Sequence, residues 1–173
     1  MSTAPAKMGV LAGEQFACIK ISGRANFSSS IDLKTVVQEL RQKGCSYFVL
    51  ELSECTLMDS TFLGVLAGLG LQSTPARNSQ AATVIELLNP NERITELLES
   101  LGVLHLFRLT QGTLPDGMDI QALSQGCPTR EDVKRACLEA HRTLMQLSPE
   151  NAAKFKDVAA FLAEDLKKGR PTP

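Results

Sequence analysis

Two short and nearly continuous apolar runs constrain the fold of this chain most strongly. Residues 46–52 (SYFVLEL) and 83–88 (TVIELL) are rich in β-branched, aromatic and aliphatic side chains, which is typical of strands covered on both faces of a sheet. Residues 16–23 (FACIKISG) alternate apolar with polar side chains and predict a half-buried strand. A shorter strand at residues 8–11 is expected to pair with it as a hairpin.

Amphipathic helices are predicted between these strands. Apolar residues recur at i, i+3, i+4 and i+7 through residues 33–40, and Gly44 follows as a C-terminal cap. A second helix is expected to begin near Ser60 and contains Gly64 and Gly68. A glycine inside a helix costs about 1 kcal/mol relative to alanine, so the two glycines imply a close approach of this helix to another element.

The segment NPNE marks the start of a third helix. Asn89 is predicted as its N-cap, Pro90 as its first residue and Glu92 as the acid of a capping box. Residues 103–109 then predict an edge strand. Strands that alternate with helices in this way predict a mixed α/β sheet domain, assigned to residues 1–110.

The rest of the chain has a different character. Residues 111–128 lose periodicity and are interpreted as a linker, in which MDIQAL (residues 118–123) predicts a helical turn or a strand extension. Two amphipathic segments separated by SPEN then predict an αα-hairpin over residues 129–169. Because helix propensity alone does not hold such a pair, its apolar stripes need cover from each other, the first domain or a second copy of the chain.

Composition excludes several classes of function. Hydrophobic residues make up 43% and charged residues 21% of the chain, with a net charge of -1 and no basic stripe, so no direct nucleic-acid contact is expected. No signal peptide and no run of about 18 apolar residues is present, which predicts a cytoplasmic protein without membrane insertion.

Metal, cofactor and disulfide chemistry are not predicted. His105 and His141 have no second ligand at metal spacing, so neither a metal site nor a cofactor is expected. The cysteines form no CxxC pair and are interpreted as reduced thiols, with Cys55 as buried filler: Cys18, Cys45, Cys55, Cys127 and Cys137.

The segment LMDSTFLG (residues 57–64) holds an acid and two hydroxyls at a strand-to-helix junction. Asp59 and Ser60 are not expected to perform acyl chemistry, because no motif supplies Ser60 with a neighbouring base. A phosphate-cradling GxxxxGK loop is also missing, so nucleotide hydrolysis is not favoured. Taken alone, Ser60 is interpreted as a helix cap.

Residues 48–69 (FVLELSECTLMDSTFLGVLAGL) resemble the signature of STAS domains, the anti-sigma factor antagonists of bacteria. In that family a buried strand runs into a loop that ends in Asp-Ser-Ser/Thr-Gly-Leu-Gly, and a partner anti-sigma kinase phosphorylates the serine. Residues 88–109 resemble the family's last helix and strand. The similarity covers about residues 8–110, and implies a mixed sheet of four to five strands covered by helices.

The resemblance assigns roles to individual residues. Ser60 matches the phosphoacceptor and Asp59 the acid before it, while Thr61, Leu63 and Gly64 match the rest of the motif. The chain departs from the family in two places. Phe62 stands where a glycine is typical, and Gly23 to Asn26 (GRAN) stand where the family has an acidic turn.

The resemblance implies a non-enzymatic anti-sigma factor antagonist that binds an anti-sigma serine kinase. Phosphorylation at Ser60 would switch it off, and a phosphatase would reset it. Partner contacts are expected from the residues around this serine, with Phe62 projecting as an apolar anchor: Asp59, Thr61, Phe62, Gly64, Arg24 and Asn26. The alternative is a STAS-like structural or scaffold subunit without a phosphate cycle. In either case the C-terminal helices are a candidate homo-oligomer interface.

Overall fold

The computed structural model describes residues 6–72, 83–114, 120–123 and 126–169. Its centre is a mixed, seven-stranded sheet with the order β6-β5-β3-β2-β1-β7, in which β4 also pairs with β2. The strands are β1 (Lys7–Ala12), β2 (Phe16–Ala25), β3 (Tyr47–Glu51), β4 (Cys55–Met58), β5 (Val84–Leu88), β6 (Arg108–Thr110) and β7 (Gln121–Ala122).

Strand pairing follows from the sequence pattern. β1 and β2 form the predicted antiparallel hairpin, whereas β2, β3, β5 and β6 run parallel. The apolar runs of β3 and β5 are central strands, as expected, and bury Phe48, Leu50 and Leu87. The parallel strands are joined by helices, as parallel pairing requires.

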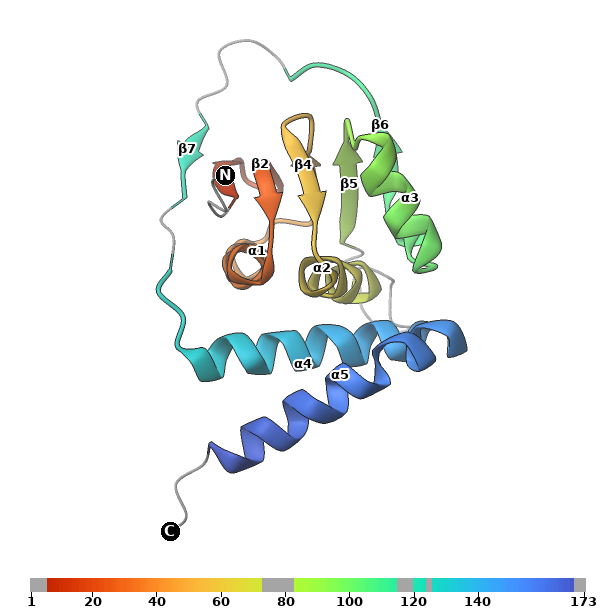
Figure 1. The fold of residues 1–173 in the computed structure, drawn as a ribbon. Coiled ribbons are helices and arrows are strands. Elements are labelled where there is room, and N and C mark those ends of the chain that lie inside the picture. Colours follow the sequence, from red (N-terminus) through yellow and green to blue (C-terminus); the bar gives the residue numbers. More distant parts are fainter. Residues whose placement is uncertain (1–5, 73–82, 115–119, 124–125, 170–173) are drawn as a thin grey trace.

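The helices are α1 (Phe27–Gln42), α2 (Ser60–Gln72), α3 (Glu92–Ser100), α4 (Arg130–Leu147) and α5 (Pro149–Lys168), with a short 3-10 turn at Leu104–Leu106. Helices α1, α2, α4 and α5 lie on one side of the sheet, and α3 lies apart from them beside β5 and β6 (Figure 1). α1 and α2 lie between the sheet and α4, and α5 lies on the outer side of α4. Of the three covers considered for the C-terminal hairpin (α4 and α5), the structure therefore shows the first domain, together with contacts between the two helices.

Several predicted boundaries are wrong. A loop is expected at residues 24–29 before the apolar stripe of residues 33–40, but α1 already begins at Phe27, because Asn26 accepts hydrogen bonds from the first turn and forms a capping box with Ser29. Asn91, not Asn89, caps α3, and Asn89 instead adopts a positive φ of 57°. The edge strand expected at residues 103–109 is mostly the 3-10 turn, followed by the three-residue β6.

Two strands add to the predicted four or five. β4 lies in the segment expected to be a loop before Asp59, and it pairs with the end of β2. Of the helical turn and the strand extension predicted for residues 118–123, the structure shows a strand: β7 comprises two residues, which pair with β1. Residues 118 and 119 lie outside the described residues.

Candidate functional site

Asp59 joins the N-termini of two helices. Its Oδ1 accepts a hydrogen bond from the Phe62 amide at 2.8 Å, in the first turn of α2. Its Oδ2 accepts one from the Phe27 amide at 2.9 Å, at the first residue of α1. Free amides and the helix dipole favour an anion at a helix N-terminus. The carboxylate therefore has a structural role that fixes α1 and α2 relative to each other.

Ser60 is the first residue of α2 and is half-buried. Its Oγ lies 2.9 Å from Nε2 of His141 on α4. The other ring nitrogen, Nδ1, lies 2.6 Å from the Cys137 carbonyl oxygen. A carbonyl oxygen only accepts, so Nδ1 carries a hydrogen, and in the neutral ring Nε2 accepts the hydrogen bond donated by Ser60.

Thr61 and Gly64 complete the contact with α4. The Thr61 hydroxyl donates to the Cys137 Sγ at 3.3 Å, and a Cβ placed at Gly64 would lie 2.5 Å from the Ala140 carbonyl oxygen. Real Cβ atoms essentially never approach so closely, so the two helix backbones touch here because residue 64 is glycine. We call these contacts, together with that of Ser60, the α2–α4 seam. The predicted close approach of α2 is thus confirmed at Gly64.

Phe62 does not project from α2. Its side chain is 0% exposed and belongs to the hydrophobic core. The expectation of an apolar surface anchor at this position is therefore wrong. Thr61 and Gly64 contact α4, whereas the Phe62 ring fills space in the hydrophobic core that a glycine would leave empty.

Arg24 and Asn26 lie together with Asp59 at the end of β2. These side chains line a small pocket of about 220 Å³, along with Ala25 and Leu57. Arg24 is exposed, and Asn26 is half-buried because its side chain caps α1. Three of the sequence-predicted residues thus lie at this pocket, Ser60, Thr61 and Gly64 lie in the seam, and Phe62 lies in the core.

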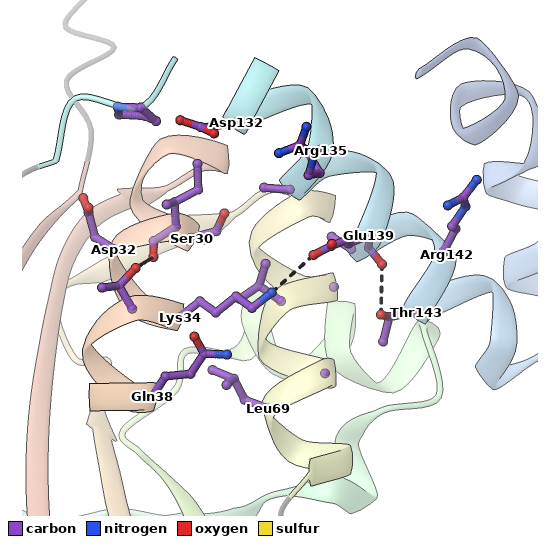
Figure 2. Close-up of a pocket in the computed structure, with 18 of the residues that line it drawn as sticks. Ser30, Asp32, Lys34, Gln38, Leu69, Asp132, Arg135, Glu139, Arg142 and Thr143 are labelled. Atoms are coloured by element: carbon purple, nitrogen blue, oxygen red, sulfur yellow. Dashed lines mark hydrogen bonds and ion pairs between the residues drawn. The ribbon is translucent and has the colours of Figure 1, made fainter. Parts of the chain in front are cut away.

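A larger cavity of about 760 Å³ flanks the seam between α1, α2 and α4. Figure 2 shows Lys34 of α1 reaching across α2 toward Glu139 of α4, and the two charges form an ion pair at 3.2 Å. Gly68 lies in the lining, and a Cβ there would meet only Thr143 Cγ2, at an ordinary 3.9 Å. The second glycine of α2 therefore borders open space and makes no backbone contact with α4.

The pairing of a serine with a histidine raises the question of nucleophilic chemistry. A histidine that accepts from a serine hydroxyl is the arrangement that activates serine nucleophiles, in which a further group orients the base. Here the Cys137 carbonyl orients His141, and Ser60 lines neither the 220 Å³ pocket nor the 760 Å³ cavity described above. In that part of the chain, no cluster of three or more potential ligands could hold a metal ion.

His141 is the residue that sequence reasoning missed. It is separated from Ser60 by 81 positions and is buried, with its ring packed against Phe155 of α5 at a centroid distance of 5.1 Å. The available signal was its position on the apolar stripe of α4, one residue after Ala140 and three before Leu144. A polar residue on such a stripe needs a buried partner.

Cys55 is a buried thiol, as predicted. Burial raises its pKa from 9.0 to about 11, although hydrogen bonds with the backbone of Leu57 and Ala25 lower it in part. The thiolate is the reactive form of cysteine, so this side chain is unreactive at neutral pH.

Comparisons with known proteins support the fold assignment. No family model and no curated protein matches the chain. The anti-sigma factor antagonist SpoIIAA in its unphosphorylated form matches with a TM-score of 0.51 and 15% identity, over 62% of this chain and 89% of that chain. The Bacillus cell fate determinant SpoIIAA in the phosphorylated form matches with a TM-score of 0.49 and 16% identity, over 62% and 92%.

None of the helices in the described part of the chain combines the length and the apolar character that a membrane crossing needs. The chain has a mixed α/β fold that resembles that of SpoIIAA, an anti-sigma factor antagonist with a STAS fold, and it ends in two additional helices.

Proposed function

We propose that this protein is an anti-sigma factor antagonist: a non-enzymatic module that binds an anti-sigma serine kinase and is switched off by phosphorylation at Ser60. The observation that carries the proposal is the position of the Asp59-Ser60-Thr61 triplet at the start of α2 in a SpoIIAA-like fold. A bacterial, cytoplasmic setting and a phosphatase that removes the phosphate belong to the same proposal.

A phosphate at Ser60 would act mainly on partner binding. It adds about -1.5 to -2 charges at a helix N-terminus, whose amides and dipole accommodate anions. The Asp59 carboxylate already accepts the hydrogen bond of the Phe62 amide in the first turn of α2, so the phosphate charge would lie beside the negative charge of Asp59. Binding a partner at the pocket of Arg24, Asn26 and Asp59 would then require desolvation of two adjacent anions. A loss of about 3 kcal/mol lowers affinity more than a hundredfold.

The test begins with the serine kinase that co-purifies with the protein. The protein is incubated with this kinase and ATP, the modified residue is mapped by mass spectrometry, and kinase retention is compared for wild type, Ser60→Ala and Ser60→Asp. Thr129→Asp is the matched control, because it places the same charge at the N-cap of another helix, α4. The proposal predicts modification at Ser60 and loss of the kinase by Ser60→Asp alone.

The alternative is a structural or scaffold subunit without a phosphate cycle. It is favoured by the seam itself, since α4 covers Thr61 and Gly64 and engages the Ser60 hydroxyl. Equal retention of the partner by Ser60→Ala and Ser60→Asp, with no modification by the co-purifying kinase, would replace the switch with this second function.

A further inference from the structure

We propose that the face of α2 formed by Ser60, Thr61 and Gly64 is a docking surface for an amphipathic helix, and that α4 occupies this surface in cis until a partner helix displaces the C-terminal hairpin. The identity of the partner rests on the proposed function. The occupancy of the surface by α4 rests on the structure itself and is tested separately below.

The shape of the surface fits a helix. Three positions on α2 contact α4 along one face, and each contact differs in kind: a hydroxyl to a histidine, a hydroxyl to a thiol, and a glycine against a backbone. Close helix crossings need a small residue at the point of nearest approach, and Gly64 meets Ala140 there. An occupant therefore needs a small residue at the crossing and a polar group one residue later, as α4 has in Ala140 and His141.

The seam combines buried contacts at Thr61, Gly64 and His141 with half-buried and exposed ones at its margin. Ser60 and Cys137 are only half-buried, and the Lys34–Glu139 ion pair that ties α4 to α1 is exposed, with side-chain exposures of 42% and 58%. Exposed ion pairs of this kind contribute little to stability. The 760 Å³ cavity also separates α4 from α1 beside the seam.

Side-chain contacts join the two helices of the hairpin, so that we expect α4 and α5 to move as one unit. His141 packs on Phe155, and Lys134 of α4 forms an ion pair with Asp165 of α5 at 2.5 Å. One anchor to the first domain lies at the turn between the helices, where the Asn151 side chain donates to the Leu101 carbonyl oxygen at 2.9 Å. Displacement requires separation of the seam and of Leu144 and Phe155 from the hydrophobic core, while the contacts between α4 and α5 are kept.

The same geometry regulates access to Ser60. A phosphoryl group on the Ser60 oxygen needs space that His141 Nε2 fills at 2.9 Å. The serine is therefore modified only in the open state, and a partner helix binds this face of α2 only after the same opening has uncovered it. When the competent state is a minor one, apparent affinity falls by the fraction of molecules that are open.

The test uses a disulfide that locks the hairpin closed. Thr61→Cys places a thiol where the hydroxyl lies 3.3 Å from the Cys137 Sγ, so a bond of about 2.05 Å needs little movement. Oxidised glutathione accepts the two electrons and protons of the two thiols, and dithiothreitol reverses the bond. A Cys127→Ser background removes the exposed thiol, and Thr61→Cys with Cys137→Ser is the control that cannot lock.

In the presence of ATP, the co-purifying kinase should phosphorylate Ser60 of the oxidised Thr61→Cys variant at least about tenfold more slowly than Ser60 of the reduced variant. His141→Ala removes the contact without altering α2 and should raise both Ser60 modification and kinase retention about fivefold. Gly64→Ala should raise modification yet lower retention, because its Cβ stands at the helix crossing. Equal rates for oxidised and reduced protein, or equal retention by His141→Ala and Gly64→Ala, overturn the proposal.

Native-state hydrogen exchange tests the opening without any kinase. Amides of α4 should exchange through an opening that leaves the amides of β3 protected, and oxidation of the Thr61→Cys variant should abolish this difference. Exchange of α4 only together with β3 would show that the hairpin never leaves the folded domain, and would overturn the proposal. Absence of Ser60 modification in every variant, with this exchange pattern intact, would instead count against the proposed function.

Discussion

Substituting Gly64 and Gly68 of α2 by alanine should have opposite effects on stability. Gly64→Ala and Gly68→Ala gain the same helix propensity, about 1 kcal/mol each. A Cβ at Gly68 meets Thr143 Cγ2 at 3.9 Å, an ordinary contact. A Cβ at Gly64 lies 2.5 Å from the Ala140 carbonyl oxygen, so α4 must retreat by about 0.9 Å to reach the 3.4 Å of ordinary contact.

Overpacking of this kind typically costs 1–3 kcal/mol, and here the obstacle is backbone, which cannot rotate away. We therefore expect Gly68→Ala to raise the free energy of unfolding by about 0.5–1 kcal/mol. For Gly64→Ala the overpacking cost exceeds the propensity gain, and the free energy of unfolding should fall by up to about 2 kcal/mol. Urea unfolding at one temperature measures both values. A Gly64→Ala protein as stable as Gly68→Ala would refute the backbone contact between α2 and α4.

Other substitutions test the local arguments. Asn26→Ala should lower the free energy of unfolding by about 1 kcal/mol, measured by urea unfolding, because α1 loses its capping side chain. Asn151→Ala leaves the buried Leu101 carbonyl unpaired and should cost about 1–3 kcal/mol in the same assay. The pKa of Cys55 is raised from 9.0 to about 11 in the folded state, so the unfolded chain loses this proton first and stability should fall as pH rises through that window. Cys55→Ala should show a shallower fall.

Much of the fold follows from local pattern. The apolar runs of β3 and β5 and the helical stripes predict their elements because burial on both faces, or on one stripe, leaves a distinct periodicity. β4 and β6 were missed or misplaced because strands of three or four residues carry too few positions to show a period. The α3 cap was misassigned because Asn89 and Asn91 both have cap chemistry, and only the backbone shows that Asn89 adopts a positive φ.

The candidate site was predictable in part. The motif around Ser60 identified the correct helix start, since the residues are adjacent in sequence. Its surroundings depend on the packing of α4 against α2, which no local pattern specifies, and so the Ser60–His141 pair was not predicted. The burial of Phe62 was also missed, because its direction depends on which side of α2 faces the sheet.

The most direct test of this account is the state of the His141 ring in solution. Nitrogen NMR of the imidazole groups reports which ring nitrogen carries the hydrogen and whether the other accepts a hydrogen bond, and exposed His105 provides an internal reference. The account predicts a hydrogen on Nδ1 and an acceptor shift at Nε2 that Ser60→Ala changes while the His105 signals stay fixed. Identical His141 signals in wild type and Ser60→Ala would contradict the claim that the C-terminal hairpin engages Ser60.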